Sequence, residues 1–425
     1  MGQWKPLTAR ISVAFAGVFF WGSIVGLFSL CHVTRSVVAR FVTQINVGVW
    51  YYLPSLKGTL FLCCVSVLAA PIVTDSRRIL ANVQKDTLRN TLGVCAGVAI
   101  LLGLMVLPAL GNQSMGEGYA WRSLAPFDQD TSNYSKQLFM PAIAHVLFFR
   151  EGWLYYLFFN FVFLVFLSVL YAWLRNHTRV KPWHFLSLST CSFVVFQYQF
   201  PGYPDILMFT FFVLVMTPEY TQQSKLSFLL LALATHFLSV FVGTVLAYRY
   251  LNRSCRLRYF VAAALYGVIW LAAYDFNFQK IFGEHNNILG MSAQDWLFIS
   301  PLAEALGVFI AFKAVWWLLI LAMVLALRRR LYREAIFMAG CVFAGLLITF
   351  LGVDTSRHMA VAFPGVLVAL ETIGKHMPQR TGNRIFSVVF SVNMIIPSFY
   401  VGLNMWIELR PGLYEILYSI FAQFG

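Results

Sequence analysis

The sequence predicts an all-α fold, a polytopic bundle of transmembrane helices, and three observations carry this prediction. Of the 425 residues, 60% are hydrophobic and only 11% are charged, whereas a soluble domain carries about 25% charged residues. The mean hydropathy is +0.72. Apolar runs of spanning length recur along the whole chain, and in lipid a helix satisfies its backbone polar groups within one segment. We therefore expect about nine regular spans plus two broken or re-entrant segments.

The regular spans are predicted where apolar runs approach the ~20 residues that a transmembrane helix needs. They occupy 11–31, 58–74, 91–111, 152–173, 259–274, 303–327, 335–352, 359–373 and 385–407. These runs lack the alternation of polar and apolar residues that is typical of strands, so we expect no strands.

Two further apolar stretches, 184–217 and 226–247, are less regular. The first is interrupted by the sequence Gly-Tyr-Pro-Asp at 202–205, and the second by Thr-His at 235–236. Each stretch either enters and returns as a hairpin or crosses once. The hairpin is favoured, because both interruptions lie in the middle of a run, where a turn would fall.

Basic residues predict the orientation of the bundle. Short segments between the runs hold 20 of the 31 Lys and Arg, at 1–10, 75–90, 174–183, 248–258, 328–334 and 374–384. Cytoplasmic loops of membrane proteins are enriched in these residues. This bias accounts for the net charge of +14 without a nucleic-acid partner, because no basic face interleaves with exposed aromatics. The acidic loops 112–151 and 275–302 then lie outside.

Loop 112–151 contains Asp128 and Asp130, flanked by Arg122 and Lys136. A carboxylate here could take a proton from an acceptor, with cations beside it for a phosphate leaving group. Alternatively, the D-x-D is a turn or helix cap in a solvated loop. The apolar stretch 138–150 suits an interfacial helix in the headgroup plane.

The link 353–358 carries Asp354, Arg357 and His358 between two apolar runs. Charged residues at a membrane boundary are costly without partners, so they indicate a functional site by default. The planar Arg fork suits phosphate. The alternative is an internal ion pair that caps a helix starting near 356, with Asp354 or Thr355 at its N-cap.

The two interruptions bring further polar residues into apolar stretches. Asp205 follows the Gly-Tyr-Pro break, and its expected partner is His236 at the other break. Broken helices are tolerated at membrane depth where they line a cavity. Alternatively, His236 is a packing residue. Lys313, near the middle of 303–327, is expected to face a polar interior, and Glu304 begins the same run on the outer side.

The stretch from about 91 to 373 resembles the multi-spanning GT-C class of glycosyltransferases and the related bacterial polysaccharide polymerases. The motifs are Arg122-Ser-Leu-Ala-Pro126, then Asp130, Tyr134 and the Pro141 stretch, Gly-Tyr-Pro-Asp205, Ala-Leu-Ala-Thr-His236, and Asp354-x-x-Arg357 before a Pro-Gly helix. The resemblance implies two leading helices in 1–90, a catalytic core in 91–373, and a C-terminal helix and tail in 374–425.

The resemblance implies transfer of a sugar from a polyprenyl-phosphate or polyprenyl-diphosphate carrier to a glycan or protein acceptor. The site would face the periplasm, in a bacterial inner membrane, with membrane lipid around it. Asp128 or Asp130 would be the base, and Arg122, Arg357 and Lys136 would bind phosphate. Asp oxygens are compatible with Mg²⁺ or Mn²⁺ on that phosphate, although no pattern fixes a metal.

The residue pattern also indicates further candidates for substrate binding and an alternative function. The further candidates for substrate binding are Asp205, His236, Asp354 and His358. The alternative function is a secondary transporter or a lipid-linked glycan flippase, since Asp205, His236 and Lys313 fit a coupled site near the midplane. The large outer loops and the lack of an internal repeat favour the transferase.

Overall fold

The computed structural model describes residues 56–81, 85–105, 117–126, 137, 139–150, 152–273, 301–351, 354–402 and 405–408. Helices hold 83% of these residues, as the all-α prediction requires. The first helices are α2 (Leu56–Ala81), α3 (Lys85–Met105), α4 (Glu117–Arg122), α5 (Phe139–Val146), α6 (Gly152–His177), α7 (Pro182–Ser189), α8 (Ser192–Gln199), α9 (Asp205–Met216), α10 (Gln222–Thr235) and α11 (Ser239–Tyr250). The later helices are α12 (Arg253–Ala273), α15 (Pro301–Phe312), α16 (Val315–Arg328), α17 (Tyr332–Leu351), α18 (Thr355–Ala360), α19 (Phe363–His376) and α20 (Gln379–Ile395).

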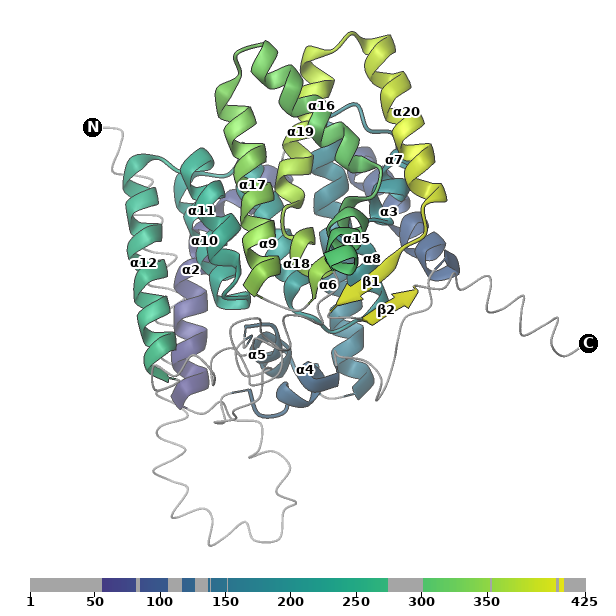
Figure 1. Cartoon of the computed structure of the whole chain (residues 1–425). Coiled ribbons are helices and arrows are strands. Elements are labelled where there is room, and N and C mark those ends of the chain that lie inside the picture. The colour runs from purple at the N-terminus through teal and green to yellow at the C-terminus, as the bar shows by residue number, and fades with distance from the viewer. Residues whose placement is uncertain are drawn as a thin grey trace, which may run out of the picture.

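The bundle has two distinct ends. The turns α11–α12, α16–α17 and α19–α20 lie at its upper end in Figure 1, and α4 and α5 lie at its lower end. Contacts join other basic segments to the upper end, because Arg179 Nη1 donates to the Met377 carbonyl (3.1 Å) and Arg249 Nη1 to the Arg333 carbonyl (3.4 Å). We call this the basic end and the opposite one the distal end.

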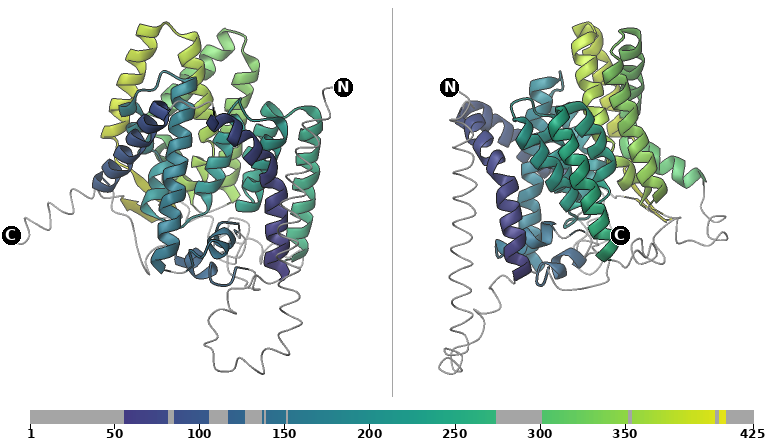
Figure 2. Two further views of the ribbon diagram at one scale, coloured as in Figure 1. Left: turned by 180° about the vertical axis from the view of Figure 1, so that it is seen from behind. Right: turned by 90° about the vertical axis from the view of Figure 1, so that its left-hand side faces the viewer.

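Each broken stretch folds back on itself. Helix α9 runs from Asp205 at the distal end to the basic end, where Arg78 Nη2 donates to the Glu219 carbonyl (2.8 Å). Helix α10 runs back to the distal end, where His236 follows it. Helix α11 then runs to the basic end, where the Tyr250 carbonyl accepts a hydrogen bond from Gln222 Nε2 (3.2 Å). The hairpin alternative is therefore the one observed, and both interruptions lie at turns (Figure 2).

The Gly-Tyr-Pro-Asp turn has a local cause. Gly202 has a φ of 109°, a backbone conformation that other residues rarely adopt. Tyr155 of α6 donates its hydroxyl to the Gly202 carbonyl (2.9 Å) and so holds the turn against the bundle. Pro204 then fixes the N-cap of α9, and Asp205 occupies its first turn, where a negative charge favours the helix N-terminus.

Two of the described helices are long and apolar enough to cross a membrane, Leu154–His177 and Tyr332–Thr349. A third crossing is possible if the bent pair Glu304–Phe312 and Val315–Arg328 counts as one span. This is fewer than the predicted nine regular spans. Part of the difference has a physical reason, since the predicted spans 359–373 and 385–407 form helices α19 and α20 of only 14 and 17 residues, below the ~20 that a span needs. The predicted span 11–31 lies outside the described residues.

The run 303–327 was predicted to be one continuous span. It forms two helices instead, α15 and α16, which meet at an angle of 79°. Lys313 lies at the bend with a φ of 48°. The sequence around it contains neither Gly nor Pro, so the pattern of apolar residues alone predicted a continuous span. The run 359–373 is likewise divided, because α18 ends at Ala360 and α19 begins at Phe363.

The predicted helix 385–407 is wrong in its second half. Helix α20 ends at Ile395, since Pro397 forces the preceding residue into an extended conformation. An antiparallel hairpin follows, β1 (Phe399–Gly402) and β2 (Met405–Glu408), with Phe399 opposite Glu408 and Gly402 opposite Met405. The expectation of an all-helical chain without strands therefore fails here.

Candidate functional site

A buried ion pair joins the first break to the link before α18. Arg357 donates from Nε to Asp205 Oδ2 (2.6 Å) and from Nη2 to Asp205 Oδ1 (3.2 Å). Both residues are more than nine-tenths buried. This bidentate geometry is the strongest form of Arg–carboxylate contact. It connects residues that are 152 positions apart in the chain.

Asp354 is the second carboxylate of the cluster. Arg357 Nη1 donates to its Oδ2 (2.9 Å), and the Tyr400 hydroxyl donates to its Oδ1. Burial raises the pKa of Asp354, but the Arg357 guanidinium outweighs it and holds that pKa below the ordinary value. Burial and the Asp354 charge both raise the pKa of Tyr400, so this hydroxyl remains a donor. Tyr400 belongs to β1, which lies in the range 385–407 that was predicted as a helix.

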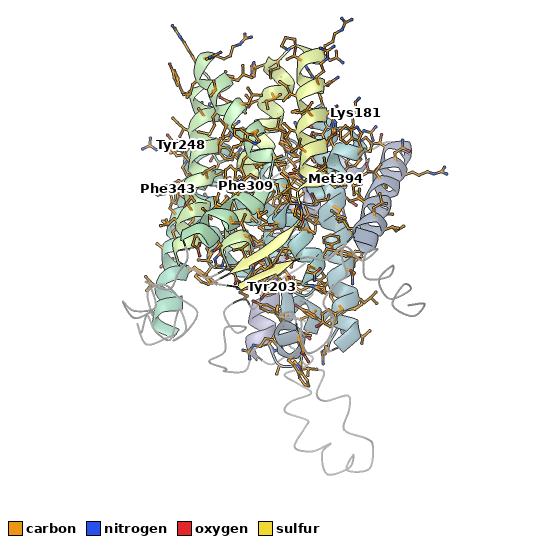
Figure 3. The ribbon with its side chains drawn as sticks, turned by 45° about the vertical axis from the view of Figure 1, so that its right-hand side comes forward. Lys181, Tyr203, Tyr248, Phe309, Phe343 and Met394 are labelled. Atoms are coloured by element: carbon orange, nitrogen blue, oxygen red, sulfur yellow. The ribbon has the colours of Figure 1, made fainter. Side chains whose placement is uncertain are left out.

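Aromatic rings enclose the guanidinium. The Tyr203 ring lies 4.1 Å from Arg357 Cζ, and the Phe196 ring lies 5.8 Å from it. Tyr203 lies beside the β-hairpin in Figure 3. Such rings attract a cation through their negative faces and keep water away. Asp205, Tyr203 and Asp354 thus fix Arg357 from three sides.

His236 links the ion pair to the outer loop. Its Nε2 lies 3.6 Å from Asp205 Oδ1, as the sequence predicted for these two breaks, and 2.9 Å from Gln137 Nε2. The Leu238 amide donates to Nδ1 (3.1 Å), so the proton of this imidazole is on Nε2. The side-chain amide of Gln137 thus contacts the edge of the imidazole that faces Asp205.

Tyr119 continues the same chain of contacts. Its hydroxyl lies 2.6 Å from Gln137 Oε1, and its ring packs edge-on against Tyr203 at 5.4 Å. Tyr119 belongs to α4, and Gln137 precedes α5. The outer loop is therefore attached to the cluster on both sides of segment 127–136.

His358 and Glu304 border the cluster. His358 is buried, and its Nδ1 has no hydrogen-bond partner in the described part of the chain. Burial lowers its pKa to about 4, so the imidazole is neutral at pH 7. Thr355 donates to Glu304 Oε2 (2.7 Å), which places α15 beside the start of α18.

The structure brings together five of the predicted site residues: Asp205, His236, Asp354, Arg357 and His358. Asp128, Asp130 and Lys136 lie outside the described residues. Arg122 ends α4, one turn after Tyr119. The predicted ion pair of Asp354 with Arg357 is present, and Asp354 is the N-cap residue of α18 but makes no side-chain cap hydrogen bond.

The predicted interfacial helix 138–150 is shorter and more buried than expected. Helix α5 covers Phe139–Val146, and most of its side chains pack into the protein. His145 Nδ1 contacts the Ser123 carbonyl (2.8 Å) and ties α5 to the segment after α4. Leu147 and Phe148, just after the helix, are exposed.

Sequence reasoning missed Tyr400, Gln137 and Tyr119. A signal for Tyr400 was available, because Pro397 and the sequence Gly-Leu-Asn at 402–404 flank a short β-branched and aromatic stretch, the pattern of a hairpin. No local signal marks Gln137 or Tyr119, since their importance comes from tertiary contacts, of Gln137 with His236 and of Tyr119 with Gln137 and Tyr203.

The cluster carries a net negative charge, from two carboxylates and one guanidinium with neutral imidazoles. Among the residues that the structure describes, three of the five Arg357 N–H groups donate to carboxylates, which leaves two for a ligand. Within the described ranges, no group of three or more His, Cys, Asp or Glu side chains could hold a metal ion. The arrangement can bind a polar ligand and orient it, with one fixed cation.

Comparison with protein-family models, curated proteins and solved structures finds no match for this chain.

Proposed function

We propose that this chain is a polytopic integral membrane glycosyltransferase of the inner membrane. It transfers a sugar or glycan from a polyprenyl-(di)phosphate carrier to a glycan or protein acceptor on the periplasmic face, in surface polysaccharide or glycoconjugate assembly. Its transmembrane spans accompany two re-entrant hairpins. The observation that carries the proposal is the contact of Gln137, in the outer loop, with His236 at the Asp205–Arg357 ion pair.

Membrane embedding is supported by the outer surface of the bundle. Soluble monomers rarely expose large contiguous apolar areas. Here large apolar side chains are exposed on α2, α3, α6, α12, α16, α17 and α20, including Val67, Leu92, Ile100, Phe161, Leu265, Trp317, Ile336, Phe343, Val388 and Ile395. Figure 3 labels Phe343 among them. A surrounding lipid phase would remove this surface from water.

The depth of the cluster supports an outer-face site. Helices α9 and α10 have 12 and 14 residues, so Asp205 and His236 lie about 18–21 Å from the basic end. A hydrocarbon core is about 30 Å thick. With the basic end in the cytoplasm, the cluster lies in the outer half, and α4 and α5, which belong to loop 112–151, lie at the outer end of the bundle.

The chemistry requires few groups, because the carrier phosphate is already a good leaving group. The bond from the sugar C1 to the phosphate oxygen breaks, and a bond from C1 to the acceptor oxygen forms. The acceptor proton passes to Asp128 or Asp130 as base. The two remaining N–H groups of Arg357, with Arg122 and Lys136, hold the departing phosphate. These cations also offset the negative charge of the cluster, and Mg²⁺ or Mn²⁺ on the phosphate would do the same.

The test is complementation of a deletion strain with variants D128N, D130N and R357K, scoring surface glycan and lipid-linked precursor. We expect loss of glycan from R357K and from one Asp variant, with precursor accumulating on the outer face. Arg249→Lys, at the basic end, is the matched control and keeps full output. Full output from all three variants would refute the proposal.

A second function, transport or flipping of a lipid-linked glycan, is favoured by the broken helices that meet at a buried ion pair. The sidedness of the accumulated precursor separates the two functions. A transferase defect leaves precursor that periodate oxidises in intact spheroplasts, whereas a flippase defect leaves it protected inside. A defect in solute movement from D205N, with normal glycan, would favour a secondary transporter.

A further inference from the structure

Lys313 forms a second buried cationic site, at the bend between α15 and α16. Only 1% of the residue is exposed. Its Nζ donates to Ser398 Oγ (2.6 Å), the Ile396 carbonyl (3.0 Å) and Thr190 Oγ1 (3.3 Å). These contacts use all three N–H groups of the ammonium. Every acceptor is neutral, and no carboxylate of the described residues pairs with this charge.

This arrangement is costly for the folded protein. A buried charge without a counter-ion loses hydration that neutral acceptors only partly replace. Lys313 also has a left-handed φ of 48°, which a residue with a side chain adopts only when its surroundings impose it. Strained residues of this kind cluster at functional sites, and stability alone does not explain a lysine here.

The contacts of Lys313 lead directly to the candidate site. Ser398 immediately precedes β1, and its hydroxyl donates onward to the Thr190 carbonyl (3.0 Å). Two residues later, Tyr400 donates to Asp354. Ser356 and Val401 exchange two hydrogen bonds, Val401 N–H to Ser356 Oγ (3.1 Å) and Ser356 Oγ to the Val401 carbonyl (3.4 Å). One short strand therefore connects the Lys313 ammonium to the Asp354 carboxylate.

Lys313 acts on the site through these hydrogen bonds. Its contacts with Ile396 and Ser398 hold the segment just before β1, and β1 carries Tyr400 to the Asp354 carboxylate.

We propose that Lys313 is a positioning residue that docks β1 so that the Tyr400 hydroxyl is held on Asp354. This inference rests on the proposed transferase function, in which Asp354 fixes the phosphate-binding Arg357. Lys313 itself touches no substrate. Its effect on transfer passes through Ser398, Tyr400 and Asp354, in that order.

The test is Lys313→Met, which removes the charge and keeps nearly the same volume. Replacing an unpaired buried charge with an apolar residue removes the desolvation cost of that charge. We therefore expect an unchanged or higher melting temperature, together with an at least tenfold loss of glycan output. Hydrogen–deuterium exchange in lipid nanodiscs should become faster in 396–402 and stay the same in α20. Lys225→Met, at the other buried lysine, is the matched control and keeps output.

A double-mutant cycle with Tyr400→Phe tests the route of the effect. If Lys313 acts through Tyr400, the double variant loses no more output than the more damaged single variant. A melting temperature that falls together with output, unchanged exchange in 396–402, or fully additive losses would each overturn the proposal. If R357K also keeps full output, the transferase function itself fails, while the exchange experiment still decides whether Lys313 docks the strand.

Discussion

Two buried aspartates lie at opposite ends of the α9–α10 hairpin, and each is only 3% exposed. At the basic end, Asp75 accepts from the Thr221 amide (2.8 Å) and the Ser224 hydroxyl (2.6 Å), with Arg78 3.4 Å away and largely in solvent. At the distal end, Asp205 is paired with the buried Arg357 and contacts His236. Asp75 caps the N-terminus of α10, which is a structural role.

The comparison teaches that burial does not distinguish a structural carboxylate from a candidate functional one; the partners do. The Asp75 carboxylate accepts hydrogen bonds from the neighbouring helix α10. Loss of its ion pair with the exposed Arg78 would cost little free energy. Asp205 depends on charges that distant segments bring into the buried interior. Matched substitutions at the two ends separate these roles.

The largest difference is expected for the two arginines. Arg357→Met leaves Asp205 and Asp354 without their buried cation, which should cost about 3–5 kcal/mol and abolish glycan output. Arg249→Met breaks a partly exposed pair with Glu334 (3.5 Å) and should cost at most about 1 kcal/mol. Unfolding in detergent, monitored by intrinsic fluorescence, measures the stability loss of both variants. Equal losses would mean that the distal pair is no more than a surface contact.

The two aspartates should differ in the kind of damage. Asp205→Asn leaves Arg357 paired with Asp354 and changes the charge of the cluster, so glycan output should fall at least tenfold. Asp75→Asn weakens a helix cap by about 1 kcal/mol and should leave output unchanged. Parallel measurement of melting temperature and glycan decides this point. An output loss from Asp75→Asn at normal protein level would contradict the division of roles.

The two tyrosines give a smaller contrast. Tyr400→Phe removes a hydrogen bond to a charged group, worth about 1.5–3 kcal/mol. Tyr220→Phe removes the contact with the Ser76 hydroxyl (3.2 Å), worth about 0.5–1.5 kcal/mol. The Tyr400 variant should also lose output several-fold. If the two variants have equal stability and output, the hairpin does not contribute to the site.

The smallest effect is expected for the two glutamines. Gln137→Leu removes the link between the outer loop and His236, and we expect output to fall about threefold, near 0.6 kcal/mol by the relation of free energy to rate. Gln222→Leu breaks contacts with Tyr250 and Asn252 at the basic end and should not change output. Glycan yield at matched expression is the measurement. If the Gln137 variant keeps full glycan output, the contact of the loop with His236 does not contribute to the site.

Much of the distal cluster could be predicted from sequence, because its residues are polar where their neighbours are apolar. Asp205 and His236 each interrupt an apolar run, and Arg357 lies in a short link between two such runs. Lipid leaves residues of this kind few partners except one another. Tyr400 could not be found this way, since a tyrosine in an apolar run is unremarkable. No Gly or Pro lies next to Lys313 to predict the bend there, and the bend depends on tertiary contacts with Ser398 and Ile396.

The long separation between Asp205 and Arg357 has a consequence for biosynthesis. At 5–20 residues per second, the 152 residues between them take about 8–30 s to synthesise. His236 emerges much earlier, within about 2–6 s at the same rate. In the proposed membrane topology, the α9–α10 hairpin is therefore synthesised before Arg357, and the His236 imidazole is the first of the two partners available to Asp205. The His236 contact, the longer of the two in the finished protein, then precedes the ion pair.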